Sequence, residues 1–169
     1  MSKAVPFHVA LLDASHDRAS FDSDSAELNR YLQQQATQDI RRRVTACFVA
    51  VTSDDAQRIA GYYTLASSSV LLHDLPAATG KKLPRYPSVP VVRMGRLAVA
   101  KTFKGAGLGA ALLADALGRA ARAEIAAYAL VVDAKDDAAA SFYRHHGFIA
   151  MPSAQRTLFL PLAPVKDLA

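Results

Sequence analysis

A glycine-rich segment between an apolar strand and an amphipathic helix constrains this chain more than any other feature. The segment runs from Lys104 to Gly109, after a strand predicted over Val91–Val99. The helix that follows presents one apolar face, formed by Leu108, Leu112, Ala116 and Ala120. Glycines permit a positive φ, and the first N–H groups of a helix have no intrahelical partner. A strand, a glycine loop and a helix N-terminus in this order predict a phosphate site in an α/β domain.

Two common phosphate-binding loops do not fit this segment. A Walker A loop ends in Gly-Lys-Ser/Thr, which reaches the terminal phosphates and holds magnesium. Here Gly109 is followed by Ala110 and Ala111, so an NTPase is excluded. The dinucleotide fingerprint Gly-x-Gly-x-x-Gly follows an early strand, whereas this loop is late in the chain and its first glycines are Gly105 and Gly107. The third possibility is the coenzyme A loop, whose pattern is Gln/Arg-x-x-Gly-x-Gly/Ala. Lys104, Gly107 and Gly109 match this pattern, with lysine in place of the usual glutamine or arginine.

The rest of the chain alternates strands and helices, with no linker or internal repeat. A first helix is predicted from an N-cap at Asp24 to the basic run at Arg41–Arg43, and a later one from Asp136 or Asp137 to a C′ glycine at Gly147. Four prolines between Pro76 and Pro90 predict a surface loop without a helix. Further strands are predicted at Phe7–Leu12, Cys47–Val51, Ile59–Leu65, Ala129–Val132, Phe148–Met151 and Leu158–Leu160, with a further extended segment over Ser67–Leu75. We predict one α/β domain over residues 1–169.

Composition limits the chemistry and the surroundings of the chain. The single cysteine, Cys47, has no partner for an internal disulfide, and the five histidines lack metal-ligand spacing, so we predict no metal site. No apolar run is long enough to span a membrane. These observations predict a soluble, cytoplasmic protein.

Positive charge is concentrated around the glycine loop. The net charge is +5, and no acidic residue occurs between Asp74 and Asp115. The same stretch carries Lys81, Lys82, Arg85, Arg93, Arg96, Lys101 and Lys104. Such a stretch indicates either a polyanionic partner, such as a phosphorylated cofactor or a nucleic acid, or a solvated face that promotes solubility.

The glycine loop and its flanks resemble the GNAT superfamily of acetyl-CoA-dependent N-acetyltransferases over most of the chain. The flanks are Gly95–Val99 before the loop and Asp136–Phe148 after it. The resemblance implies a mixed, mostly antiparallel sheet flanked by helices, in which a splayed strand pair forms the CoA slot. It assigns cofactor binding to Leu97, Ala98, Val99, Lys104, Gly105, Ala106, Gly107, Leu108, Gly109 and Asp136. The last replaces an asparagine of many relatives.

The same resemblance implies a general acid at Tyr143. In the Phe142-Tyr143 pair we expect Phe142 to be core and Tyr143 functional. No general base is evident. An α-amine, with a pKa of about 7.7–8.0, is already partly neutral at pH 7, which favours a peptide-like or aminoacyl acceptor over a lysine side chain.

More narrowly, Gly95–Val99, the proline-rich basic loop and Val132-Asp133-Ala134 resemble the TacT/AtaT-type toxins of type II toxin–antitoxin systems. Ser23-Asp24 stands where that subgroup usually has cysteine and glycine. The resemblance implies an aminoacyl-tRNA substrate, a ribbon-helix-helix antitoxin and a homodimer. Its candidate tRNA contacts are Lys81, Lys82, Arg85, Arg93 and Arg96. For Arg96, an internal ion pair is the alternative.

Two other functions remain open. The first is a GNAT enzyme that acetylates a small amine or a protein N-terminus. The second is a non-catalytic regulator that binds acyl-CoA. The presence of Tyr143 and of an intact glycine loop argues against the regulator.

Overall fold

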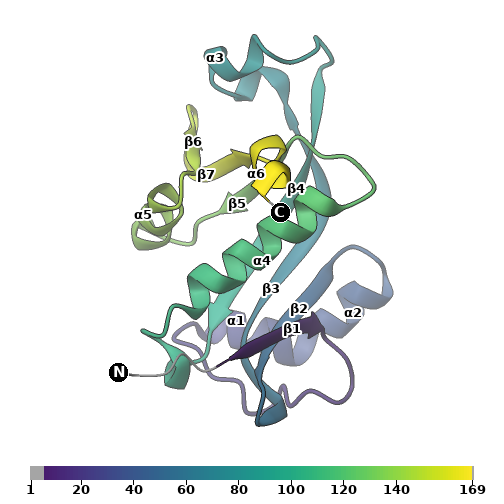
Figure 1. Cartoon of the computed structure of the whole chain (residues 1–169), viewed down its shortest axis with the longest axis vertical. Coiled ribbons are helices and arrows are strands. Elements are labelled where there is room, and N and C mark those ends of the chain that lie inside the picture. The colour runs from purple at the N-terminus through teal and green to yellow at the C-terminus, as the bar shows by residue number, and fades with distance from the viewer. Residues whose placement is uncertain (1–5, 169) are drawn as a thin grey trace. The chain divides into compact units, whose positions relative to one another are not determined.

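The computed structural model describes residues 6–168 and divides into two compact units, each described here by itself. The first unit extends to Ala66 and includes Arg96–Ala116, and the second contains Ser67–Gly95 and the chain from Leu117 onward. Figure 1 shows the course of the chain. Within residues 6–168 seven strands are hydrogen-bonded in the order β1-β2-β3-β4-β5-β7-β6. The β4–β5 pair is parallel, whereas the pairs β1–β2, β2–β3, β5–β7 and β7–β6 are antiparallel. The predicted mixed, mostly antiparallel sheet is therefore confirmed.

Three antiparallel strands build the first unit. They are β1 (Phe7–Leu11), β2 (Ala46–Thr52) and most of β3 (Asp55–Leu71), whose residues from Ser67 onward belong to the second unit. The strands predicted at Cys47–Val51 and Ile59–Leu65 are confirmed as an antiparallel pair, but β3 has 17 residues and is longer than Ile59–Leu65. It also takes in Ser67–Leu71, which confirms the start of the extended segment predicted over Ser67–Leu75.

The first helix is interrupted by a π turn. It consists of α1 (Ala26–Arg30), a π-helical turn at Tyr31–Gln35 and α2 (Ala36–Arg41). The predicted N-cap at Asp24 is wrong: the side chain of Ser25 accepts a hydrogen bond from the Leu28 N–H at 3.2 Å. Serine caps as well as aspartate, so the sequence alone does not separate the two neighbours.

The parallel pair belongs to the second unit. There β4 (Ser88–Val99) pairs with β5 (Ala129–Asp133), which pairs in turn with β7 (Ala154–Pro161), and β7 with β6 (Ile149–Met151). The core of this unit includes the buried side chains of Val91, Val131 and Phe159. The unit also contains α5 (Asp137–His145) and α6 (Ala163–Leu168), of which α6 was not predicted.

The helix after the glycine loop is α4 (Leu108–Arg122). The four apolar side chains predicted to share one face are all buried, which confirms the amphipathic pattern. No helix within residues 6–168 is long and apolar enough to cross a membrane.

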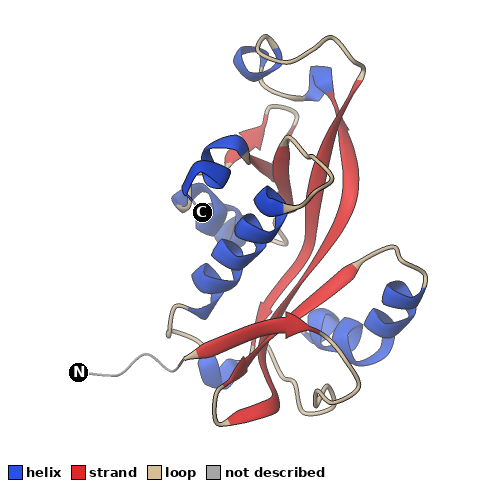
Figure 2. Cartoon of the chain, turned by 45° about the vertical axis from the view of Figure 1, so that its right-hand side comes forward, coloured by secondary structure: helices blue, strands red, loops and turns tan. Residues whose placement is uncertain are grey.

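The prediction of a loop without a helix between Pro76 and Pro90 is wrong in part. A single helical turn, α3 (Ala77–Gly80), follows Pro76, and Figure 2 shows it between the ends of β3 and β4. Proline is tolerated immediately before or at the first helical position because its missing N–H has no helical partner there. The Pro76 carbonyl accepts the Gly80 N–H at 2.9 Å, which closes the turn.

Gly61 allows β3 to pack closely in the first unit. A Cβ atom at this position would lie 2.9 Å from the Ala98 carbonyl oxygen and 2.9 Å from Cδ1 of Leu112. We expect Gly61→Ala to lower the free energy of unfolding by about 1–3 kcal/mol through overpacking. The corresponding fall in Tm is roughly 2–12 °C for a chain of this size.

Thermal unfolding followed by circular dichroism measures this effect, with Gly80→Ala as the matched control. A Cβ atom at Gly80 would meet only atoms of Leu72, at 3.7 and 3.9 Å, which are ordinary contacts. Equal Tm values for Gly61→Ala and Gly80→Ala would contradict the packing argument.

Candidate functional site

The predicted phosphate loop has the backbone conformation that its glycines suggest. Gly105 and Gly107 both have φ of +79°, in the region that only glycine enters readily. Steric crowding does not require glycine at these positions, since a Cβ atom would have no neighbour within 4 Å at either of them. The loop leads into α4, and the Ala111 N–H donates to the Gly107 carbonyl at 3.1 Å. The first N–H groups of this 15-residue helix therefore open onto the loop.

The lysines beside this loop are ion-paired with a segment near the N-terminus. Lys104 Nζ contacts a carboxylate oxygen of Asp24, and Lys101 Nζ lies 3.4 Å from Oδ2 of Asp22. The charge that the sequence offers to a phosphate at Lys104 is thus partly neutralised in this state. Both pairs are about half exposed, so water and salt weaken them.

The parallel pairing of the strand before the loop stops before that strand ends. The register of β4 with β5 ends at Met94 and Val132, although β4 continues to Val99. The three residues predicted to contact pantetheine, Leu97, Ala98 and Val99, follow the point where this pairing stops. This early end of the pairing between β4 and β5 agrees with the splayed strand pair expected from the GNAT resemblance.

Tyr143 lies in the core of the second unit, near the end of α5. Its side chain is 6% exposed, and its ring packs against Phe148 with centroids 5.6 Å apart. Burial and the nearby charge of Asp133 raise the pKa of Tyr143 above that of a free phenol, so its hydroxyl stays protonated. The expectation that Phe142 is the core residue of the pair is wrong, because Phe142 is only partly buried.

Asp136 is the N-cap of α5. Its Oδ1 accepts a hydrogen bond from the Ala139 N–H at 2.8 Å. At the other end of the helix Gly147 has φ of +92°, which confirms it as the C′ glycine. These two caps determine where α5 begins and ends, and thereby where Tyr143 stands on it. Asp136 thus has a structural role alongside its predicted contact with the cofactor.

Asp133, which the sequence analysis named only within a resembling segment and without a role, accepts an ion pair and a hydrogen bond here. It lies at the end of β5, where Oδ2 accepts from Arg93 Nη1 at 2.6 Å and Oδ1 accepts from Thr157 Oγ1 at 3.2 Å. Arg93 is 30% exposed and also donates to Ser68. The candidate tRNA contact at Arg93 is therefore engaged with Asp133. Only strand pairing brings these residues together, so no local signal could have found the pair.

Arg96 packs against the π turn of the first unit. Its guanidinium lies 3.5 Å from the centroid of the Tyr31 ring, a cation–π contact. The Tyr31 hydroxyl donates to Oδ2 of Asp39 at 2.8 Å, and Gln35 donates to Oδ1 of the same carboxylate at 3.0 Å. This contact with an aromatic ring replaces the internal ion pair weighed for Arg96.

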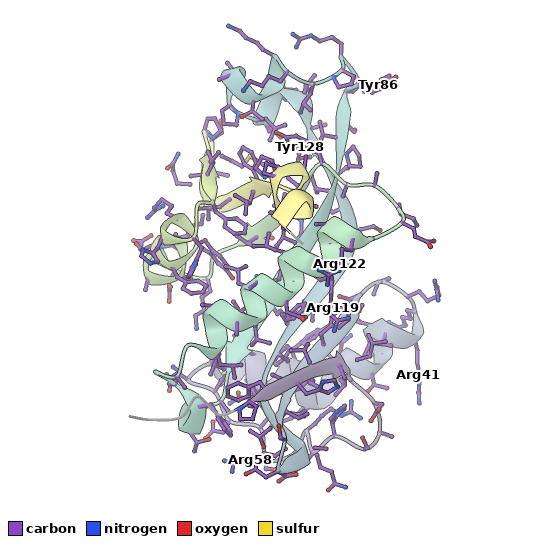
Figure 3. All side chains as sticks on the ribbon, viewed as in Figure 1. Arg41, Arg58, Tyr86, Arg119, Arg122 and Tyr128 are labelled. Carbon is purple, nitrogen blue, oxygen red and sulfur yellow. The ribbon has the colours of Figure 1, made fainter. Side chains whose placement is uncertain are left out.

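The other candidate tRNA contacts stand free on the surface of the second unit. Lys81, Lys82 and Arg85 are exposed in the segment between α3 and β4. The neighbouring Tyr86 is 70% exposed, and Figure 3 labels it beside the start of β4. Of the predicted tRNA contacts, Lys81, Lys82 and Arg85 are therefore exposed to solvent, whereas Arg93 and Arg96 contact side chains of this protein.

Comparisons with known proteins agree with this geometry. Residues 18–165 match the family model described as the acetyltransferase (GNAT) domain. A tRNA-acetylating toxin of Mycobacterium tuberculosis is 36% identical over 154 residues, which are 90% of each chain.

Solved structures of similar proteins cover nearly the whole chain. The toxin AtaT complexed with acetyl-methionyl-tRNAfMet superposes with a TM-score of 0.88 at 28% identity, over 96% of this chain and 99% of that one. A tyrosine-to-phenylalanine mutant of AtaT, bound to the C-terminus of the antitoxin AtaR and to acetyl-CoA, gives 0.79 at 26% identity, over 96% and 97%. This chain belongs to the GNAT family and is an acetyl-CoA-dependent N-acetyltransferase.

Proposed function

We propose that this enzyme is a toxin that acetylates the α-amino group of aminoacyl-tRNA and so blocks translation. The observation that carries the proposal is its similarity, over 90% of both chains, to a tRNA-acetylating toxin. The structure of AtaT with an acetylated aminoacyl-tRNA supports the same class of acceptor. The exposed cations Lys81, Lys82 and Arg85 suit a polyanionic substrate.

On the donor side, the glycine loop binds the pyrophosphate of acetyl-CoA. The amides from Lys104 to Gly109 form the anion site, and Lys104 adds a point charge once its pair with Asp24 opens. Backbone groups of Leu97–Val99 bind the pantetheine arm, because β4 there has left its pairing with β5.

On the chemical side, the amine attacks the acetyl carbon directly and Tyr143 acts as general acid. The C–N bond forms, the C–S bond of the tetrahedral intermediate breaks, and the phenol proton of Tyr143 passes to the departing CoA sulfur. Water takes the proton released by the amine, whose pKa of about 7.7–8.0 leaves part of it neutral at pH 7, and solvent returns a proton to the Tyr143 oxygen. The raised pKa of Tyr143 keeps the phenol protonated for this step.

On the acceptor side, the exposed cations contact tRNA phosphates, and Arg93 and Arg96 join them only if their internal contacts open. The basic run Arg41–Arg43 extends this surface, and Figure 3 shows Arg41 projecting away from α2. Because cation–phosphate contacts release counterions, activity should fall steeply as salt rises.

We also propose a small antitoxin of the ribbon-helix-helix type as the partner that silences the enzyme. The complex of AtaT with the C-terminus of AtaR supports an antitoxin. A homodimer and a cytoplasmic site of action, where charged tRNA occurs, remain predictions of the resemblance.

The test is to find where the acetyl group goes. The protein is incubated with acetyl-CoA labelled in the acetyl group and with charged total tRNA. We expect label on aminoacyl-tRNA, a rate that falls steeply with salt, and growth arrest on expression that Tyr143→Phe relieves. Label found only on free amines or protein N-termini would contradict the toxin and support a GNAT enzyme with another acceptor. Binding of acetyl-CoA without any transfer would support an acyl-CoA-binding regulator.

A further inference from the structure

A pocket of about 730 Å³ lies at the tip of the β3–β4 hairpin in the second unit. We call it the tip pocket. Its lining includes Leu71, Leu72, Leu75, Lys81, Arg85 and Tyr86. The volume falls within the range of about 300–1,000 Å³ typical of small-ligand sites.

The tip pocket combines an apolar floor with an exposed aromatic wall. Leu75 is buried in the core of the unit, whereas Leu71 is 45% exposed. Tyr86, on the same pocket, leaves 70% of its side chain in contact with water. An exposed aromatic ring on the wall of a pocket offers a face on which a planar ligand can stack.

The rim of the tip pocket is positively charged. Lys81 and Arg85 line it directly and Lys82 lies next to Lys81 in the chain. His73 also lines the pocket, and its Nε2 lies 3.5 Å from Oδ1 of Asp74. Asp74 is the one acidic residue in the sequence from Leu71 to Pro87, and Lys81, Lys82 and Arg85 outnumber it, so the pocket favours an anionic ligand.

Hydrogen bonds hold the tip in shape before any ligand arrives. The Leu72 N–H donates to the Pro87 carbonyl at 2.9 Å, which joins the two ends of the tip. The Leu83 N–H donates to the Gly80 carbonyl at 3.2 Å, which forms a turn between α3 and Arg85. A preformed pocket binds a ligand at a lower cost in conformational entropy than a mobile loop does.

We propose that the tip pocket receives one unpaired base of the RNA substrate. The base stacks on the Tyr86 ring over the leucine floor, while Lys81 and Arg85 contact the phosphates on either side of it. Proteins that read single-stranded RNA combine aromatic stacking with basic side chains in this manner. The inference rests on the proposed function, since it assigns part of the same substrate to a site remote in sequence from Tyr143.

The alternative occupant is an acidic protein segment, such as part of an antitoxin. Such a segment would use the lysines and the arginine, but the flat and exposed Tyr86 ring matches the π-face of a base better than it matches a carboxylate. The two occupants are distinguished by whether Tyr86 contributes to RNA affinity.

The test measures the Kd of aminoacyl-tRNA for the full-length enzyme and for Tyr86→Ala, Tyr86→Trp and Ile125→Ala. Ile125 is the matched control, because it is an apolar side chain of the same unit that is 87% exposed. We expect Tyr86→Ala to weaken binding roughly tenfold, Tyr86→Trp to retain it, and Ile125→Ala to change nothing. Lys81→Ala should instead lower the salt dependence of binding, which Tyr86→Ala leaves unchanged.

A second set of RNAs identifies the base. In each, one unpaired nucleotide is made abasic. At one position the loss of the base should weaken binding to the wild type about tenfold and leave the already weakened Tyr86→Ala variant unaffected. Equal affinities of wild type and Tyr86→Ala for every RNA would overturn the proposal, as would a Tyr86 effect confined to binding of an acidic antitoxin peptide. Absence of acetyl transfer to any aminoacyl-tRNA would instead overturn the proposed function, so the two failures are distinct.

Discussion

Replacing Tyr143 by phenylalanine is expected to lower kcat for acetyl transfer by roughly 10²- to 10⁴-fold, the usual contribution of a general acid. The ring stays in place because its packing against Phe148 does not involve the hydroxyl. Only the proton for the departing CoA sulfur is lost, so the Kd of acetyl-CoA should not change. Single-turnover acetyl transfer measures the rate, and calorimetry measures the Kd.

Tyr128→Phe is the matched control for this variant. Tyr128 belongs to the same unit, packs against the core that contains Val131, and loses the same atom. Its kcat should equal that of the wild type. If Tyr143→Phe also retains wild-type kcat, the phenol is not the general acid.

The pKa of Tyr143 gives an independent check of the same assignment. Burial, and secondly the negative charge of Asp133, raise this pKa above the ordinary value of about 10. A spectrophotometric titration of wild type minus Tyr143→Phe should therefore show no half-formed tyrosinate at pH 10. Because Asp133→Asn removes a negative charge that opposes ionisation, it should lower the midpoint.

The second large effect is expected from alanine at both positive-φ glycines of the phosphate loop. Alanine in the left-handed region costs about 1–2 kcal/mol per residue. The variant Gly105→Ala/Gly107→Ala therefore loses about 2–4 kcal/mol, divided between stability and binding. If the loop relaxes to negative φ, its amides turn away from the pyrophosphate and the whole loss falls on acetyl-CoA affinity. The Kd then rises roughly 30- to 700-fold.

Thermal unfolding with and without acetyl-CoA separates the two contributions, since a ligand stabilises only the state that binds it. Gly118→Ala is the matched control. Gly118 lies inside α4, and a Cβ atom there would meet only the flexible end of Arg122. This change should leave acetyl-CoA binding intact and stabilise the helix by up to about 1 kcal/mol. Unchanged affinity of the double variant would show that the loop does not hold the donor.

Much of this protein follows from patterns that lie within a few neighbouring residues. The positive φ of Gly107, the cap at Gly147 and the buried face from Leu108 to Ala120 depend on local backbone preference and helical period. The same locality explains the errors. Whether Asp24 or Ser25 caps the first helix, and whether Pro76 precedes a loop or a helical turn, involves energy differences smaller than those of tertiary contacts.

Only the tertiary structure decided which charges of the basic stretch are free. Arg93 is paired with Asp133, Arg96 lies on the Tyr31 ring and Lys104 contacts Asp24, whereas Lys81 and Arg85 remain exposed beside Tyr86. The sequence alone determined that a phosphate loop and a basic stretch occur together. It could not divide that stretch, because the partner of a long side chain depends on which distant strands pair and in which register, and no local pattern encodes that choice.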